Sequence, residues 1–213
     1  MIVKVCGMRE PGNIRAVERL GADWMGFILW PHSSRRLGDV PCCLPRCRRV
    51  GVFVDPADED VVRWSADLGL SYIQLHGDES PARCRQVHDL TGLPVIKAIP
   101  VSQPCDMERA LGYRLRDGVA YLLFDTKCAS RGGSGQQFDW SLIQSYAGEL
   151  PFLLSGGIGP ADAPRICQFR HPLMAGVDVN SRFESAPGLK DPALLKTFIY
   201  QIRQYEQNQQ DIL

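Results

Sequence analysis

The stretch Phe152-Leu153-Leu154-Ser155-Gly156-Gly157 shows the pattern that decides the fold. Three consecutive apolar residues are followed at once by a serine and two glycines. A short apolar run without alternation is typical of a parallel strand that is covered on both faces. Seven similar runs occur along the chain. With this one they predict eight strands, at 2–6, 24–28, 50–54, 72–75, 95–99, 121–124, 152–154 and 176–179.

Amphipathic segments lie between most of these runs and predict helices. Ile14, Val17 and Leu20 are at helical spacing, and Asp58 is well placed to cap a helix over 58–68. The other helices are predicted at 13–20, 79–90, 105–111, 139–146, 161–167 and 192–204. Pro41 and Pro45 limit the segment 38–48 to helical fragments. The polar tail, 204–213, is expected to fray.

The alternation of eight strands with about eight helices predicts a parallel α/β fold. Eight such repeats in 213 residues favour a single (βα)8 TIM barrel over an open, doubly wound sheet. No long linker interrupts the pattern. We therefore expect residues 1–213 to form one catalytic domain.

Charge and hydropathy exclude several classes of partner. The 24 basic and 24 acidic residues cancel, whereas binding to nucleic acid or to an anionic membrane needs a surplus of Lys and Arg. No apolar run approaches the ~20 residues of a spanning helix, and no signal-peptide profile follows Met1. We expect a cytoplasmic protein with no nucleic-acid partner and no membrane partner.

Eight cysteines are scattered along the chain, and the densest group is Cys42, Cys43 and Cys47. A zinc site usually needs a second pair of ligands at a suitable spacing, and the sequence offers none. We expect reduced thiols and no metal.

In a (βα)8 barrel the residues at the carboxyl ends of the strands form the active site. The polar or reactive residues at these positions are Cys6, Arg35, Asp55, His76, Lys97, Asp125, the stretch 155–157 and the stretch 178–181. Two of these stretches point to phosphate. Gly156 and Gly157 allow a sharp turn that brings N–H groups close to a ligand, and Asn180, Ser181 and Arg182 follow the last strand. A simple tight turn is the alternative for the two glycines.

Several stretches resemble the phosphoribosylanthranilate isomerases in order and at suitable spacing. Val3-Lys4-Val5-Cys6-Gly7-Met8 is similar to the opening strand of that family, and the likeness continues almost to the end of the chain. The other matching stretches are 26–35, 50–54, 73–77, 95–98, 123–127, 132–135, 138–140, 154–158 and 178–181, with Glu184, Pro187, Gly188, Lys190 and Asp191. Arg182 departs from the pattern, because the family often has a glycine there.

The resemblance implies a TIM barrel that carries out an Amadori rearrangement of a phosphosugar without a cofactor. It implies Cys6 as the general base and Asp125 as the general acid. It also implies that Arg35 pairs with the anthranilate carboxylate, with Arg36 as the alternative. Asp178 is expected to bind substrate and to be the neighbouring carboxylate that keeps Asp125 protonated.

The remaining expectations concern the rim of the site and the assembly. His76 and Lys97 are expected either to have structural roles or to support a residue that contacts the substrate, with their own partners at the barrel rim. The segment 132–135 is expected to be either a lid over the site or a plain loop. The chain is expected to be a monomer or a homodimer.

Two other functions stay open from the residues themselves. One is a different phosphosugar isomerase or epimerase of histidine or tryptophan synthesis, which the lone cysteine disfavours. The other is a phosphate-binding barrel without catalysis, which the presence of both Cys6 and Asp125 disfavours.

Overall fold

A computed structural model describes residues 1–126, 137 and 139–210 of the chain, without the side chains of 209 and 210. Eight parallel strands pair in the order of the sequence, and the last strand pairs with the first to close a barrel. The strands are β1 (Ile2–Val5), β2 (Trp24–Ile28), β3 (Arg48–Phe53), β4 (Tyr72–Leu75), β5 (Val95–Val101), β6 (Val119–Thr126), β7 (Phe152–Leu154) and β8 (Met174–Val179). The predicted TIM barrel and the positions of its eight strands are confirmed.

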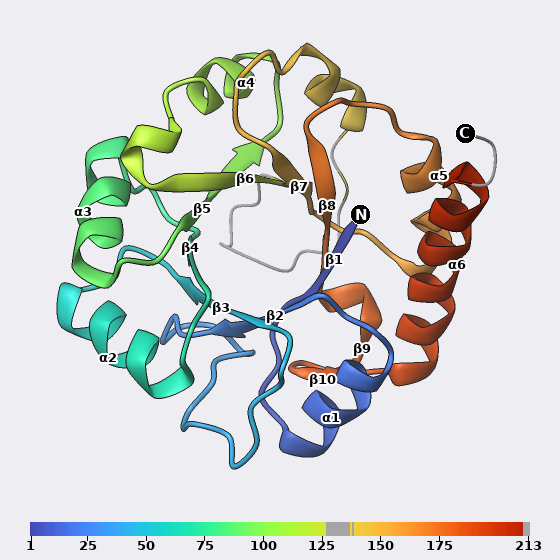
Figure 1. Cartoon of the computed structure of the whole chain (residues 1–213), viewed down its shortest axis with the longest axis horizontal. Helices are drawn as coiled ribbons and strands as arrows, with labels where there is room; N and C mark the ends of the chain where they lie inside the picture. Colours follow the sequence, from blue (N-terminus) through green and yellow to red (C-terminus); the bar gives the residue numbers. More distant parts are fainter. Residues whose placement is uncertain (127–136, 138, 211–213) are drawn as a thin grey trace.

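Helices form an outer ring around these strands, as Figure 1 shows. The α-helices are α1 (Pro11–Arg19), α2 (Asp58–Leu68), α3 (Pro81–Thr91), α4 (Cys105–Ala110), α5 (Ala163–Gln168) and α6 (Pro192–Gln210). Short 3₁₀ helices are η1 (Leu115–Asp117), η2 (Trp140–Ser145), η3 (Pro160–Asp162) and η4 (Ser181–Phe183). A small hairpin of β9 (Glu184–Ala186) and β10 (Leu189–Lys190) lies between η4 and α6. None of the helices in the described part of the chain is long and apolar enough to cross a membrane.

The ring of helices is interrupted between β2 and β3. Residues 29–47 form no helix, so the prediction of helical fragments at 38–48 is wrong. Pro41 and Pro45 each lack an N–H and restrict the residue before them, which is enough to prevent a helix here. Buried Leu37 anchors the segment, because its N–H donates to the carbonyl of Ile28 at 2.7 Å.

Three other local predictions need correction. The segment predicted as a helix at 139–146 is the 3₁₀ helix η2. Asp58 begins α2 instead of capping it, and its carboxylate accepts from Arg83 and Gln86 of α3. The tail does not fray over 204–210, because α6 continues to Gln210. Arg203 of this helix donates to the carbonyl of Met1 at 2.7 Å and ties it to the start of the chain.

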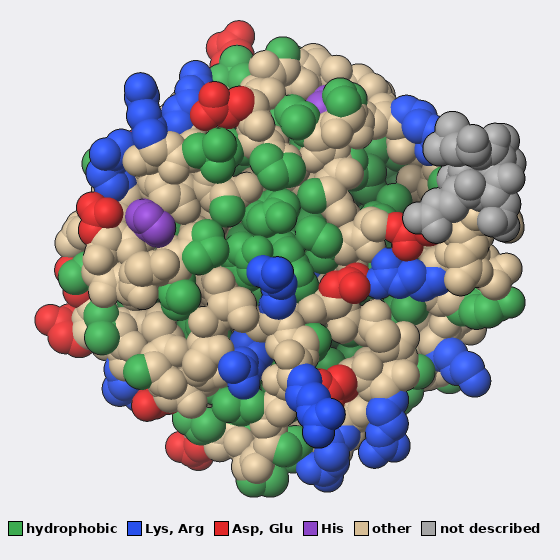
Figure 2. All heavy atoms as spheres, viewed as in Figure 1, with side chains coloured by type: hydrophobic (Ala, Val, Ile, Leu, Met, Phe, Trp, Pro, Cys, Tyr) green, Lys and Arg blue, Asp and Glu red, His purple; other side chains and the backbone are tan. Residues whose placement is uncertain are grey.

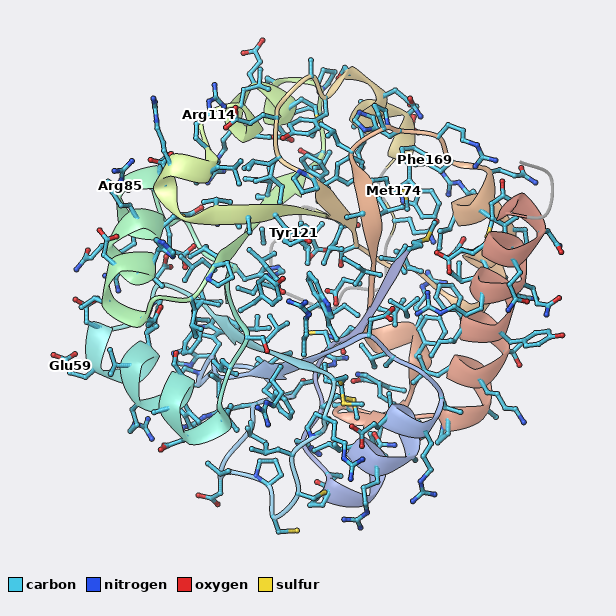
Figure 3. The ribbon with its side chains drawn as sticks, viewed as in Figure 1. Glu59, Arg85, Arg114, Tyr121, Phe169 and Met174 are labelled. Carbon is cyan, nitrogen blue, oxygen red and sulfur yellow. The ribbon has the colours of Figure 1, made fainter. Side chains whose placement is uncertain are left out.

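The amino ends of the strands are closed by an apolar layer inside the barrel. Trp24 and Tyr72 stack at 4.6 Å between ring centroids, and Tyr121 meets Trp24 edge-on at 5.3 Å. Tyr121 points toward the centre of the ring of strands in Figure 3, and a central hydrophobic area with charged side chains around it is visible in Figure 2. Val50, Ile96, Ala98, Leu123 and Leu153 pack with these rings in one hydrophobic cluster inside the barrel.

The next layer inside the barrel is polar. Side chains on one face of a strand lie two residues apart, so each strand places its next inward residue one layer nearer the carboxyl end. Tyr72 is thus followed by Gln74, and Leu153 by Ser155. Lys4, Gln74, Ser155 and Asp178 are all buried at 7% exposure or less. Because buried polar groups need partners, this layer fixes the orientation of the residues above it.

Candidate active site

The predicted base and acid both lie where the strands end. Cys6 directly follows β1, two residues after Lys4, and Asp125 is the penultimate residue of β6, two residues after Leu123. Ser155 and Gly156 connect the two sides of the barrel mouth. Ser155 Oγ is 3.4 Å from Asp178 Oδ2, and a Cβ on Gly156 would lie 3.1 Å from Asp125 Oδ1. Two residues that are distant in sequence therefore share one end of the barrel.

Cys6 is buried among charged groups, with 4% of its surface exposed. Its backbone N–H donates to the carbonyl of Val179 at 2.9 Å, which fixes it against β8. On the β2 side only a glycine leaves enough room, because a Cβ on Gly26 would lie 2.8 Å from Cys6 Sγ and 3.1 Å from Lys4 Nζ. The thiol is thus held in one place by neighbouring strands.

Burial raises the pKa of the Cys6 thiol, because the low-dielectric interior disfavours the thiolate. The nearby ammonium groups of Lys4 and Lys190 oppose this effect, and the carboxylate of Asp178 adds to it. The thiol is therefore the main form at neutral pH, and the two lysines are the groups that favour the thiolate.

Asp125 lies at the end of a hydrogen-bonded chain that starts inside the barrel. Gln74 Nε2 is 2.9 Å from His76 Nδ1, and His76 Nε2 is 3.1 Å from Asp125 Oδ2. The other carboxylate oxygen accepts from the backbone N–H of Thr126 at 2.8 Å. The expected neighbour, Asp178, instead binds Lys4 Nζ at 2.8 Å. His76, which we expected to be structural or to support a site residue, is in contact with the candidate acid.

Arg35 belongs to a charged cluster beside Cys6. Its Nε lies 3.0 and 2.9 Å from the two carboxylate oxygens of Glu184, and its Nη2 is 2.9 Å from Oε2. Lys190 Nζ binds the same carboxylate and also donates to Asn180 Oδ1 at 2.7 Å. Burial lowers the pKa of Lys190, although Glu184 counteracts the effect. The cluster puts two cations at the mouth of the barrel and balances them with one carboxylate.

The predicted phosphate residues divide into two groups. Gly156 and Gly157 adopt φ of 84° and 64°, and a Cβ on Gly156 would lie 2.3 Å from Thr126 Oγ1. The loop continues to Gly159, where an added Cβ would lie 3.1 Å from Cδ of Arg182. Arg182 and the glycine loop are therefore neighbours.

Asn180 and Ser181 relate to this loop differently. The side chain of Asn180 faces Lys190 rather than the glycines, and Ser181 begins η4 next to Arg182. The phosphate role of all five residues stays a prediction. The predicted lid at 132–135, together with Lys127 and Phe138 of the resembling stretches, lies outside the described residues.

Three residues at this end of the barrel had no predicted site role, Lys4, Glu184 and Lys190. One signal was available for Lys4, because it precedes Cys6 by two residues and therefore shares its face of β1. Lys97, which is buried on the outer face of β5, has the expected structural role. It donates to the carbonyls of Leu75, Gly77 and Ala98 and pairs with Glu79 at 3.1 Å.

Comparisons with known proteins agree over nearly the full length of the chain. The family model of N-(5'-phosphoribosyl)anthranilate (PRA) isomerase matches residues 3–201. The N-(5'-phosphoribosyl)anthranilate isomerase of Phocaeicola vulgatus is 50% identical over 206 residues, which are 96% of this chain and 98% of that protein.

Two solved structures are also similar. A phosphoribosyl anthranilate isomerase in complex with reduced 1-(o-carboxyphenylamino)-1-deoxyribulose 5-phosphate is 34% identical with a TM-score of 0.79, over 96% of this chain and 100% of that one. Monomers derived from the dimeric phosphoribosylanthranilate isomerase of Thermotoga maritima are 32% identical with a TM-score of 0.79, over the same shares of both chains.

Proposed function

The chain belongs to the N-(5'-phosphoribosyl)anthranilate isomerase family, and we propose that Cys6 is the general base and Asp125 the general acid of its reaction. The enzyme is an intramolecular aldose–ketose isomerase of tryptophan biosynthesis. It converts N-(5-phosphoribosyl)anthranilate to 1-(2-carboxyphenylamino)-1-deoxyribulose 5-phosphate. One observation supports the assignment of roles. The thiol of Cys6 and the carboxyl of Asp125 are far apart in the sequence but lie at the same end of one barrel.

Asp125 opens the sugar ring. Its protonated carboxyl gives a proton to the furanose ring oxygen, the bond from that oxygen to C1′ breaks, and the nitrogen lone pair forms the C1′=N bond of a Schiff base. His76, in hydrogen-bond contact with the carboxyl, orients it toward the substrate. The carboxylate that remains is ready to take up a proton for the next turnover.

Cys6 moves the hydrogen that changes the aldose into the ketose. Its thiolate removes the proton from C2′, the electrons of that bond form C1′=C2′, and the electrons of the C=N bond return to nitrogen. The enolamine then takes a proton at C1′ and loses one from the C2′ hydroxyl to give the ketone. Electrons move only between neighbouring carbons, so the step balances without an added oxidant or reductant.

The rest of the mouth binds the two ends of the substrate. Arg35 presents a planar guanidinium to the anthranilate carboxylate, and Asp178 accepts a hydrogen bond from the sugar. Gly156, Gly157, Asn180, Ser181 and Arg182 hold the phosphate. The juxtaposition of Arg182 with the glycine loop supports this role.

We also propose that residues 1–213 form one catalytic domain, in the cytoplasm, as a monomer or a homodimer. The barrel elements run from β1 to the end of α6 at Gln210 and support a single domain. A relative from Thermotoga maritima is dimeric. Light scattering of the purified chain distinguishes the two assemblies.

Turnover of the purified enzyme tests the assignment of acid and base. The anthranilate group makes the substrate fluorescent, and the signal falls on conversion. We expect Cys6→Ser and Asp125→Asn each to lower kcat at least about 10²-fold while the unfolding transition stays cooperative. Near-normal turnover by either variant removes that residue from its role.

A further inference from the structure

Lys4 lies directly beneath Cys6 in the barrel interior. Its side chain has no exposed surface, and its ammonium donates to Asp178 Oδ1 at 2.8 Å. Lys4 and Asp178 are also register partners between β1 and β8. If Gly26 carried a Cβ atom, that atom would lie 3.1 Å from the ammonium of Lys4 and 2.8 Å from Cys6 Sγ. Both groups thus border the same small space beside β2. One buried cation therefore binds a carboxylate and lies close to the thiol.

The charge of this lysine is retained in spite of its burial. Burial alone would lower the pKa of Lys4, but the carboxylate of Asp178 and the sulfur of Cys6 outweigh it and raise the value above that of an ordinary lysine. The charged groups that face Cys6 are thus Lys4 from β1, Asp178 from β8 and Lys190 from β10. Each lysine is bound by a carboxylate, Lys190 by Glu184 and Lys4 by Asp178, and Lys4 has the larger effect on the pKa of the thiol.

We propose that Lys4 is a positioning residue of the isomerase, whose ammonium, held in place by Asp178, stabilises the thiolate of Cys6. The inference rests on the proposed role of Cys6 as the base. When the thiolate takes the proton from C2′, the S–H bond forms as the C2′–H bond breaks, and Lys4 keeps its own proton throughout. Its ammonium pairs with the thiolate and Asp178 before the transfer, and with Asp178 afterwards.

Lys97 provides a matched control for the loss of a buried lysine. It is also fully buried, although between the strands and the helices rather than inside the barrel, and it pairs with a carboxylate, that of Glu79. Its other partners are backbone carbonyls, and the thiol that interacts with it is that of Cys84 rather than Cys6. A merely structural role for Lys4 would make Lys4→Met behave like Lys97→Met.

The test is a pH titration of the Cys6 thiolate without substrate. Each protein is compared with the same protein carrying Cys6→Ser, so that the difference in ultraviolet absorbance reports this thiol alone. We expect Lys4→Met to move the midpoint to higher pH by at least about one unit, because an opposite charge within ~4–6 Å shifts a pKa by 1–3 units. We expect Lys97→Met to leave it unchanged. The alkaline limb of kcat/KM should move with the midpoint, so that turnover at neutral pH falls about tenfold or more.

Lys4→Met leaves the buried carboxylate of Asp178 without its cation, which alone can prevent folding. A second pair of proteins tests the proposal in that case. The pair is Asp178→Asn and the double variant Lys4→Met with Asp178→Asn, in which no buried charge is left alone. The double variant should titrate at least about one unit higher than Asp178→Asn. Equal midpoints in either comparison overturn the role of Lys4. Normal turnover by Cys6→Ser overturns the proposed base instead, whatever the titrations show.

Discussion

The carboxylate of Glu184 binds the guanidinium of Arg35 through both oxygens, at 3.0 and 2.9 Å from Nε, although the two residues are 149 positions apart. Glu184 also binds Lys190 and is 4% exposed. Its burial would raise its pKa, but the hydrogen bonds from Arg35 and Lys190 outweigh this and hold the pKa below its usual range. Glu184 therefore keeps two cations of the barrel mouth together.

The first prediction concerns the stability of this cluster. Glu184→Gln leaves the buried ammonium of Lys190 and the partly buried guanidinium of Arg35 without their carboxylate, so the free energy of unfolding at neutral pH should fall by about 3 kcal/mol. A pKa that is lower in the folded state means that the unfolded chain binds more protons, so the stabilisation is present above the unfolded pKa and is lost as pH falls through the folded one. Urea unfolding of both proteins between neutral and acidic pH measures this. A constant difference across that range would contradict the prediction.

The second prediction concerns recognition of the anthranilate group. Arg35→Ala should raise KM about tenfold or more, because a hydrogen bond to a charged group is lost, and should change kcat much less. Arg36→Ala is the control, because Arg36 is exposed and next in sequence. Steady-state kinetics of both variants decide between the two arginines. An unchanged KM in Arg35→Ala, or a larger rise in Arg36→Ala, would reject the assignment.

The third prediction concerns the space around the thiol. Gly26→Ala places a Cβ 2.8 Å from Cys6 Sγ, so the sulfur must shift. We expect kcat to fall at least about tenfold, with a loss of about 1–3 kcal/mol in stability from overpacking. Gly38→Ala is the matched control, because an added Cβ there meets no atom within 4 Å. Equal turnover by the two variants would show that the position of the sulfur is not critical.

The fourth prediction concerns the residue that departs from the family pattern. Arg182→Gly removes the guanidinium beside the glycine loop and should raise both KM and the inhibition constant of inorganic phosphate, by about tenfold. Arg116→Ala, which removes an exposed arginine of η1, should change neither. If phosphate inhibits Arg182→Gly as strongly as the unchanged enzyme, the side chain of Arg182 takes no part in phosphate binding.

The sequence predicted the parts of the site that depend on position along a strand. Apolar runs located the strands. The rule that strand ends form the site of a barrel put Cys6 and Asp125 among several candidates, and the family resemblance singled out these two. The partners of these residues could not be predicted in the same way, because closure of the barrel determines them. Lys4 finds its carboxylate 174 positions away, and His76 meets Asp125 from 49 positions away.

The interrupted outer ring shows a related limit. Pro41 and Pro45 argue against a long helix after β2, but local propensity does not indicate what replaces it. The structure replaces it with an irregular segment held by buried Leu37 and by contacts of Cys43, which donates to the carbonyl of Pro11 at 3.4 Å. Such contacts join segments that are distant in sequence, here the irregular segment and the start of α1, so local propensity does not indicate them.

The kinetic isotope effect with substrate deuterated at C2′ tests the division of labour between Cys6 and Asp125 most directly. Slowing proton removal should make it fully rate-limiting in Cys6→Ser, so that the isotope effect on kcat exceeds that of the unchanged enzyme. Slowing ring opening should make that earlier step limiting in Asp125→Asn, so that the isotope effect nearly disappears. The same isotope effect in both variants, or the reverse order, would contradict the assignment of the thiol as base and the carboxyl as acid.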